Sequence, residues 1–151
     1  MEVNVYKADL SHVEIWLKLA KEFYAEGFDE WQWGFNDDHA RATYTLFIQN
    51  HLCYIAELNG EAVGCLAGVI TQHHFNYHHL YFQESMWYIK SEHRSKGIAS
   101  ELLRYVTQEC YDRKCNNIIV GHTANVMPEH MKRFYQQLGF KLFETHYIKD
   151  L

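Results

Sequence analysis

The sequence lacks several features that would point to other classes of protein. It has a single proline, Pro128, and no Pro/Gly/Ser-rich linker, internal repeat or low-complexity segment among its 151 residues. No stretch approaches the roughly 20 apolar residues of a membrane-spanning helix. Residues 1–7 show no apolar run behind a basic flank, so we expect no signal peptide. These absences favour one domain, residues 1–151, with no membrane association and a cytoplasmic location.

Basic residues and cysteine pairs are also scarce. Lys and Arg number 14 against 19 Asp and Glu, which gives a net charge of −5. Because nucleic-acid binders usually carry a basic surface, we expect no nucleic-acid partner. None of the four cysteines forms a C-x-x-C pair, and Cys53, Cys65 and Cys110 have apolar neighbours. We therefore expect buried free thiols rather than disulfides or a zinc site.

Apolar periodicity and turn residues predict the order strand, two helices, three strands, helix, strand, helix, strand. A capping box at Ser11 and Glu14 opens the first helix, and Asn59-Gly60 predicts a two-residue hairpin turn. The predicted strands lie around Val3–Val5 and at Cys53–Leu58, Glu61–Thr71, Leu80–Lys90, Asn117–Thr123 and Leu142–Ile148; the predicted helices begin at Ser11 and near Asp37 and span Lys96–Tyr111 and Pro128–Leu138. The later strand–helix–strand unit should be parallel and right-handed, so we predict an α/β (α+β) fold with a mixed central sheet and helices on both faces.

The turn after the fourth predicted strand carries the clearest chemical pattern. It reads Ser91-Glu-His-Arg-Ser-Lys-Gly-Ile-Ala99, and a helix follows at once. A helix N-terminus offers free N–H groups and a positive dipole end, and Gly97 lets the backbone approach an anion closely. His93, Arg94 and Lys96 add positive charge. The turn therefore predicts a site for a pyrophosphate.

The pattern R-x-x-G-x-A is weak when taken alone, and a plain helix start with solvated basic residues is the alternative. Its context favours the pyrophosphate: a strand precedes it, an amphipathic helix follows, and Phe134-Tyr-Gln-Gln-Leu-Gly-Phe140 comes later. With these motifs the sequence resembles the GNAT N-acetyltransferase superfamily. Residues 87–103 look like its central cofactor motif, in which Arg94, Gly97 and Ala99 match R/Q-x-x-G-x-G/A, and residues 134–140 look like its Y-x-x-L-G-F motif.

The resemblance implies a fold, a cosubstrate and a set of contacts. The fold is the GNAT acyl-CoA acyltransferase fold, with a V-shaped splay between two parallel strands, and the cosubstrate is acetyl-CoA. The end of the fourth strand would pair with the pantetheine arm, and amides of residues 95–99 would hold the pyrophosphate. The implied cofactor-binding residues are Trp87, Tyr88, Ile89, Arg94, Ser95, Lys96, Gly97, Ile98, Ala99, Ser100, Asn125 and Phe134. Asn125 is a weaker match, because the family's asparagine falls at or near Pro128.

Acetyl transfer to a primary amine needs a neutral nucleophile, and therefore a general base. We predict Glu84 as this base, with His73 or His122 as substitutes. The resemblance implies Tyr135 as the general acid. The alternatives are an exposed strand carboxylate for Glu84 and a core aromatic for Tyr135.

Two further segments are unusual. Residues 26–38 mix carboxylates with aromatic residues, which suits an amine acceptor, although these aromatics could simply pack over the sheet. Residues 73–79 contain four histidines. A zinc or nickel site is conceivable there, but we expect no metal and favour a solvated or acceptor-lining hairpin loop.

The sequence therefore predicts an N-acetyltransferase that moves the acetyl group of acetyl-CoA to a primary amine of a small molecule or protein in a ternary complex. One alternative is a non-catalytic CoA-binding sensor or interaction module with the same fold. Another is an interaction protein without a CoA site. A homodimer is a further expectation, because only one strand is predicted after the last helix.

Overall fold

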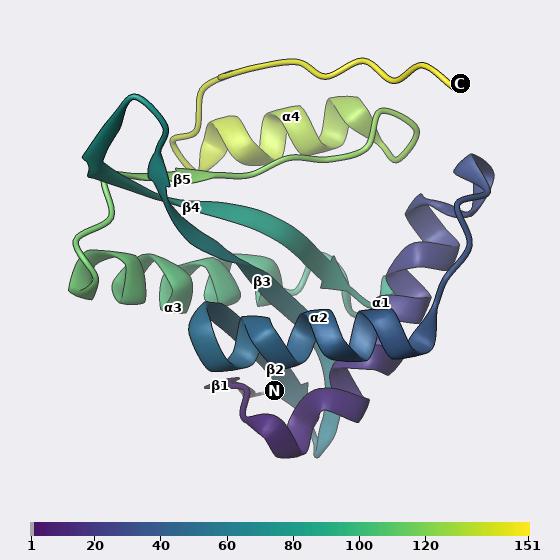
Figure 1. Ribbon diagram of the computed structural model, residues 1–151. Helices are drawn as coiled ribbons and strands as arrows, with labels where there is room; N and C mark the ends of the chain where they lie inside the picture. The colour runs from purple at the N-terminus through teal and green to yellow at the C-terminus, as the bar shows by residue number, and fades with distance from the viewer. Residues whose placement is uncertain (1) are drawn as a thin grey trace. The chain divides into compact units, whose positions relative to one another are not determined.

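A computed structural model of the chain describes residues 2–151. The described chain divides into two compact units, residues 2–121 and residues 122–151. The first unit holds the sheet and most of the helices (Figure 1). Among the described residues, no helix is both long and apolar enough to cross a bilayer.

The sheet of the first unit is mixed, as the sequence predicts. Its strands are β1 (Val3–Lys7), β2 (Leu52–Leu58), β3 (Glu61–His73), β4 (Asn76–Ile89) and β5 (Asn117–Ile119). They lie in the order β1-β2-β3-β4-β5. The first four pair antiparallel, and β5 pairs parallel with β4.

The helices cover both faces of this sheet. The first unit contains α1 (Val13–Gly27), α2 (Asp37–Asn50) and α3 (Ile98–Asp112), with short 3₁₀ turns η1 (Leu10–His12), η2 (Asp29–Trp31) and η3 (Ser91–His93). Trp16, Leu19 and Ala20 of α1 pack in one core cluster with the alternate strand residues Cys53, Ile55, Cys65, Ala67 and Met86. On the opposite face, the rings of Tyr54 and Tyr105 lie 6.0 Å apart, which places α3 there.

The buried thiols agree with the sequence prediction. All four cysteines are free; Cys53, Cys65 and Cys110 are buried, and Cys115 is half-buried. Burial raises the pKa of Cys53 and of Cys110 to about 12. Thiols with so high a pKa are poor nucleophiles at neutral pH, so these side chains act as small apolar core residues.

The start of the first helix differs from the prediction. Asp9, not Ser11, is the cap: it accepts a hydrogen bond from the Ser11 N–H at 2.8 Å, and the Asp9 N–H donates to His12 Nδ1 at 2.9 Å. The chain first makes the 3₁₀ turn η1, so the capping residue lies two positions earlier. Glu14 instead pairs with Arg41 of α2 at 2.6 Å.

The two hairpins show how the strands are joined. Asn59 and Gly60 have φ angles of 52° and 81°, which confirms the predicted turn between β2 and β3. The β3–β4 hairpin is longer than predicted, because β3 runs to His73 and β4 begins at Asn76. The predicted connection of residues 73–79 is therefore too long, since only His74 and Phe75 lie between the two strands. Aromatic residues are common in strands, so polarity alone does not mark the ends of the loop.

The second unit consists of α4 (Pro128–Gln137) and extended chain. Pro128 occupies the first turn of α4, and Gly139 follows the helix with a φ of 86°, as expected. The predicted strand Leu142–Ile148 is wrong, since residues 141–151 form no helix or strand, and β5 ends at Ile119 rather than Thr123. Alternating apolar residues suit extended backbone, but a strand also requires a ladder with a neighbour.

Gly68 is required by the close approach of β3 and β4. A Cβ atom at this position would lie 2.2 Å from the Gln83 carbonyl oxygen and 2.6 Å from Phe82 Cζ. We therefore expect Gly68→Ala to lower the free energy of unfolding by about 2–4 kcal/mol, because backbone must shift. Urea denaturation measures this loss. Thr71→Ala, at an exposed position of the same strand, should change it by less than about 0.5 kcal/mol; equal effects would contradict the steric argument.

Candidate active site

The parallel ladder between β4 and β5 is short. It joins Tyr81 to Asn117, Phe82 to Ile118 and Gln83 to Ile119, and there it ends. The next residue on β4 is Glu84, which is half-buried. Its carboxylate accepts a hydrogen bond from the Gly121 N–H at 3.1 Å. Glu84 thus lies at the point where the two parallel strands part.

A β-bulge fixes the direction of the chain at this point. Gly68 of β3 pairs with Glu84, whereas the preceding Ala67 pairs with Met86, so Ser85 is the extra residue on β4. Bulges bend a strand and redirect side chains, and they are common beside active sites. Here the bulge comes directly after Glu84, and Ser85 itself is exposed.

The pKa of Glu84 is well suited to proton transfer. Desolvation by burial raises it from 4.5 to about 7, against the opposing effect of the hydrogen bond from Gly121. A carboxyl with this pKa gains and loses a proton readily near neutral pH, as a general base requires. Perturbed carboxyls of this kind concentrate at functional sites.

The predicted pantetheine-pairing residues form the end of β4. Trp87, Tyr88 and Ile89 pair with β3 residues of the 64–66 stretch, beyond the end of the ladder with β5. The Tyr88 ring lies 5.9 Å from the ring of Phe23 in α1. These residues therefore lie on the part of β4 beyond its ladder with β5, and their pairing with the pantetheine arm stays a prediction.

The predicted pyrophosphate turn leads from β4 into α3. Ser95 and Gly97 have φ angles of 62° and 78°, and Gly97 is the N-cap residue of α3 with no side-chain cap. A Cβ atom at Gly97 would meet nothing within 4 Å, so the space above the backbone is open. Ser95, Lys96, Gly97 and Ser100 are exposed, Ala99 is half-buried and Ile98 is buried. An open helix N-terminus of this kind favours an anion, and the binding of a pyrophosphate here stays a prediction.

Arg94 has a different environment from its neighbours in the turn. Its guanidinium pairs with Glu26 of α1 and donates from Nε to the Ile89 carbonyl oxygen at 3.0 Å. It also lies 5.8 Å from the centroid of the Tyr88 ring. The Arg94 side chain therefore connects the turn to α1 and β4, and the carboxylate of Glu26 balances its positive charge.

The remaining predicted residues belong to the second unit. Asn125 lies in the turn before α4, and Phe134 and Tyr135 lie within that helix. The Tyr135 ring is 5.8 Å from that of Phe134 and 5.9 Å from the rings of Phe140 and His122. The motif Phe134–Phe140 thus brings its aromatic side chains together around Tyr135. The roles of Asn125, Phe134 and Tyr135 towards a substrate stay predictions.

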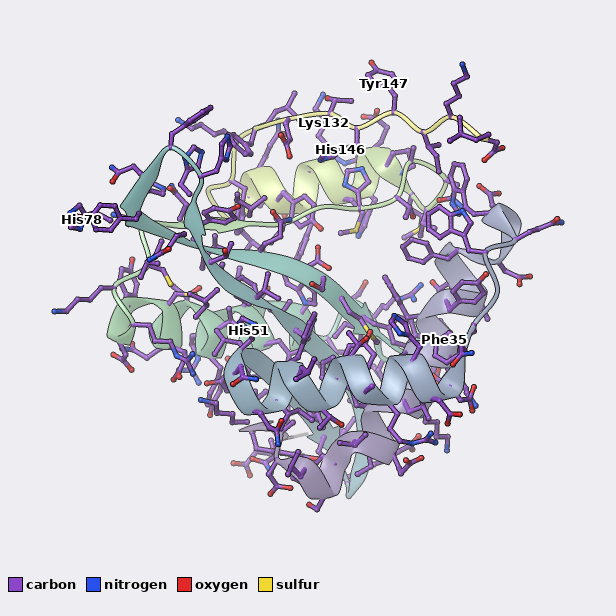
Figure 2. The ribbon with its side chains drawn as sticks, viewed as in Figure 1. Phe35, His51, His78, Lys132, His146 and Tyr147 are labelled. Atoms are coloured by element: carbon purple, nitrogen blue, oxygen red, sulfur yellow. The ribbon has the colours of Figure 1, made fainter. Side chains whose placement is uncertain are left out.

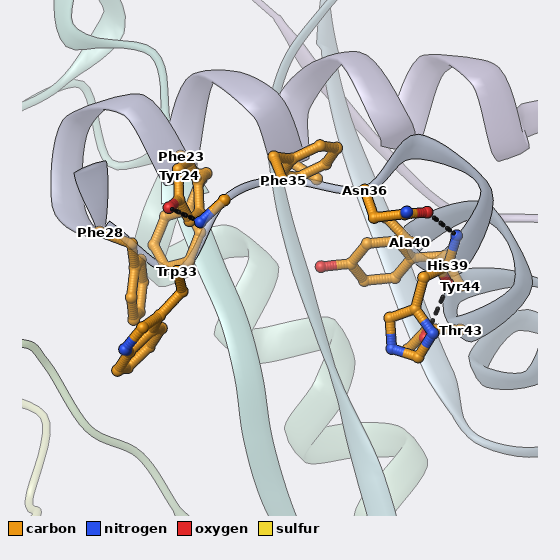
Figure 3. A pocket seen from close by; sticks show the side chains of 12 residues that line it. Phe23, Tyr24, Phe28, Trp33, Phe35, Asn36, His39, Ala40, Thr43 and Tyr44 are labelled. Carbon is orange, nitrogen blue, oxygen red and sulfur yellow. Dashed lines mark hydrogen bonds between the residues drawn. The ribbon is translucent and has the colours of Figure 1, made fainter. Parts of the chain in front are cut away.

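A cavity of ≈340 Å³ lies between α1, α2 and the segment that joins them (Figure 3). Six of its lining residues are aromatic. The lining comprises Ala20, Phe23, Tyr24, Phe28, Trp33, Gly34, Phe35, Asn36, His39, Ala40, Thr43 and Tyr44. The Tyr24 hydroxyl accepts a hydrogen bond from the Gly34 N–H at 2.8 Å and so fixes the joining segment against α1.

Sequence reasoning identified the joining segment but missed the wall contributed by the helices. Phe23, Tyr24 and Tyr44 have the helical spacing of an apolar face, which does not distinguish a cavity wall from core packing. Tyr44 approaches β4, since its hydroxyl donates to Met86 Sδ at 3.3 Å. Burial raises the pKa of Tyr44 to about 12, and the negative charge of nearby Glu84 adds to the shift. Tyr44, which lines the cavity, thus contacts the strand that carries Glu84.

The histidine-rich hairpin between β3 and β4 is not part of the aromatic cavity. His78 and Phe35 project at opposite sides of the first unit in Figure 2. The His73 ring lies 4.6 Å from that of His74 and 5.8 Å from that of His79, and His79 Nε2 is 2.7 Å from Asn117 Oδ1. Among the described residues, no group of three or more His, Cys, Asp or Glu is placed to hold a metal ion. The hairpin does not line the aromatic cavity.

Comparison with known proteins identifies a family. The model of the Acetyltransferase (GNAT) family matches residues 14–140, and so extends over both units. No curated protein sequence is significantly similar to the chain.

Several solved structures share the fold at low sequence identity. AAC(6')-Iy in complex with the bisubstrate analogue CoA-S-monomethyl-acetylneamine is 17% identical, with a TM-score of 0.80 over 100% of this chain and 99% of that chain. Ribosomal-protein-alanine N-acetyltransferase from Brucella melitensis biovar Abortus 2308 is 18% identical, with a TM-score of 0.74 over all of both chains. A predicted acetyltransferase with acetyl-CoA from Clostridium acetobutylicum is 18% identical, with a TM-score of 0.76 over 99% and 96%.

The raised pKa of Glu84 predicts a gain of stability on its neutralisation. A carboxyl whose pKa rises from 4.5 to about 7 on folding does not destabilise the fold below pH 4.5, destabilises it increasingly between these values, and does so fully above pH 7. Glu84→Gln keeps an acceptor for Gly121. We expect it to raise the free energy of unfolding by about 1–2 kcal/mol at pH 8, and to have little effect at pH 4.5.

Urea denaturation of both proteins at the two pH values measures this difference. Glu2→Gln, at an exposed carboxylate, serves as the control and should show no such dependence. Equal effects of Glu84→Gln at both pH values would show that its carboxyl titrates normally.

Proposed function

Since the chain belongs to the acetyltransferase (GNAT) family, we propose that it transfers the acetyl group of acetyl-CoA directly to a primary amine. Family membership makes it an acyltransferase with acetyl-CoA as cosubstrate. The observation that carries the finer proposal is the position of Glu84, whose carboxyl lies where β4 and β5 part and has a pKa near 7. The domain assignment, residues 1–151 as one acetyltransferase domain, is supported by a family match that extends over both units.

The turn at the start of α3 supports the binding of the diphosphate. Its open backbone at Gly97 and its uncapped helix N-terminus provide N–H donors and a positive dipole end. We assign diphosphate binding to the amides of residues 95–99, with Arg94 holding the turn against α1. The diverging arm of β4, Trp87 to Ile89, would direct the thioester towards Glu84.

Glu84 would act as the general base. An amine with a pKa near 10.4 is mostly protonated at pH 7, and freeing it costs roughly 4–5 kcal/mol. Ionised Glu84 accepts this proton, directly or through a water molecule. The amine nitrogen then attacks the thioester carbonyl carbon, a C–N bond forms, and the carbonyl oxygen becomes an oxyanion that β4 amides can stabilise.

Collapse of this tetrahedral species completes the transfer. The C–S bond breaks, its electron pair goes to sulfur, and the thiolate takes a proton. We assign this proton donation to Tyr135, on the strength of its place in the motif Phe134–Phe140. The attacking nitrogen releases its second proton to solvent, and Tyr135 regains a proton from solvent. Glu84 also returns its proton to solvent, and the products are an amide and CoA. A homodimer and a cytoplasmic location stay predictions.

The role of Glu84 is tested by the pH dependence of thiol release from acetyl-CoA in the presence of an amine acceptor. Wild-type kcat/KM should rise with pH and level off above a pKa near 7, because only ionised Glu84 accepts the proton. Glu84→Gln should lower kcat by about 100-fold and abolish the rise of kcat/KM with pH. A variant with the wild-type pH profile would exclude Glu84 as base. Absence of thiol release from the wild type with every amine would favour a non-catalytic CoA-binding module.

The role of Tyr135 is tested by Tyr135→Phe. Loss of the proton donor should lower kcat by about tenfold to 100-fold while the KM for acetyl-CoA changes little, since the ring is retained. Steady-state kinetics with saturating acceptor separate the two constants. Phe134→Leu provides a comparison in which packing changes and the hydroxyl remains. An unchanged kcat in Tyr135→Phe across the pH range would remove Tyr135 from the mechanism.

A further inference from the structure

We propose that the aromatic cavity between α1 and α2 binds the acceptor, and that this acceptor is a small arylalkylamine, with one aromatic ring on a short alkyl arm that ends in a single primary amine. The inference rests on the proposed acetyl transfer and names its substrate class. It follows from the walls of the cavity, from the charges around it, from its size, and from its connection to β4.

The walls present aromatic faces and edges to the interior. The rings of Tyr24 and Phe28 are stacked at 6.3 Å, and that of Phe28 lies 5.9 Å from that of Trp33. Phe35 meets the edge of Tyr24 at 5.7 Å. Figure 3 shows these side chains together around the cavity. Such an arrangement favours another ring, because offset and edge-to-face contacts add to the burial of apolar area.

The charges around the cavity disfavour a polycation. The joining segment is rich in carboxylates, but three of them are already paired. Glu26 pairs with Arg94, Asp37 with Lys21 at 2.5 Å, and Asp38 with Arg41 at 2.9 Å. None of these carboxylates lines the cavity. A sugar with several ammonium groups would lose hydration there without gaining matching anions, whereas one ammonium group can rely on the aromatic faces.

The polar groups of the lining are also mostly engaged. Tyr24 accepts a hydrogen bond from Gly34, Asn36 Oδ1 accepts from the His39 N–H at 2.9 Å, and Thr43 donates to the His39 carbonyl at 2.9 Å. A volume of ≈340 Å³ lies at the lower end of the range for small-molecule sites, about 300–1,000 Å³. The cavity therefore suits one compact apolar body rather than a polyhydroxylated chain.

Two contacts connect the cavity to the strand that carries Glu84. Phe23 meets Tyr88 of β4 edge-on at 5.9 Å, and Tyr44 donates to Met86 Sδ at 3.3 Å. Met86 follows Glu84 across the bulge at Ser85. Phe23 and Tyr44, which line the cavity, thus contact the strand that carries Glu84, and the proposal directs the amine of the bound ring towards that strand.

The test compares initial rates of thiol release by the full chain with five amines: tryptamine, 2-phenylethylamine, spermidine, kanamycin and an alanyl tripeptide amide. We expect kcat/KM for the two arylalkylamines to exceed the others by at least about tenfold, because burial of one ring supplies that much discrimination. A preference for spermidine, kanamycin or the peptide would overturn the substrate class and leave acetyl transfer itself intact.

Variants of Trp33 connect the preference to the cavity. Trp33 is 59% exposed, so its replacement should not unfold the chain. Trp33→Ala should raise the KM for tryptamine about tenfold and leave the KM for acetyl-CoA unchanged, and Trp33→Phe should restore much of the loss. Tyr111→Ala removes another exposed aromatic ring, from α3, and serves as the matched control. Equal KM values for tryptamine in Trp33→Ala and Tyr111→Ala would exclude the cavity.

Calorimetric titration with tryptamine separates the two proposals. If no amine releases thiol, the proposed function fails, yet tryptamine binding that Trp33→Ala weakens and Tyr111→Ala does not would still support the cavity. If thiol is released with tryptamine but neither KM nor binding responds to Trp33, the cavity assignment fails while the proposed function holds.

Discussion

The parting of β4 from β5 is the constraint on which the proposed chemistry depends. Their parallel ladder ends at Gln83 and Ile119, and Glu84 comes directly after it. At that position the carboxyl is desolvated but keeps one donor, the Gly121 N–H. The desolvation raises the pKa of Glu84, and the hydrogen bond from Gly121 opposes the shift.

The surrounding elements maintain this arrangement through close packing. Gly68 lets β4 approach β3 at the bulge, because any side chain there would meet the Gln83 carbonyl oxygen. Arg94 joins the turn before α3 to Glu26 of α1 and to the end of β4. The same α1 supplies Phe23 and Tyr24 to the aromatic cavity. The turn proposed to bind the diphosphate and the proposed acceptor cavity both contact α1.

Much of the fold and of the cofactor half of the site could be predicted from local pattern. The Asn59-Gly60 turn, the glycine after α4 and the free buried cysteines follow from short-range backbone preference and apolar context. The predictions failed where pairing with a neighbouring strand decides whether a segment is a strand. Residues 142–148 alternate like a strand but have no ladder in the described chain, and the histidines beyond Thr71 read as loop although they extend β3 and β4.

By itself the sequence determined the family, since Arg94, Gly97 and Ala99 stand between a strand and a helix and Phe134–Phe140 follows at the family's spacing. These features are local, because a helix N-terminus binds an anion wherever it occurs. Only the tertiary structure decided the environment of Glu84, the ion pairs of Glu26, Asp37 and Asp38, and the aromatic cavity between α1 and α2. Each of these joins residues distant in the chain, and desolvation and charge pairing arise only when folding brings them together.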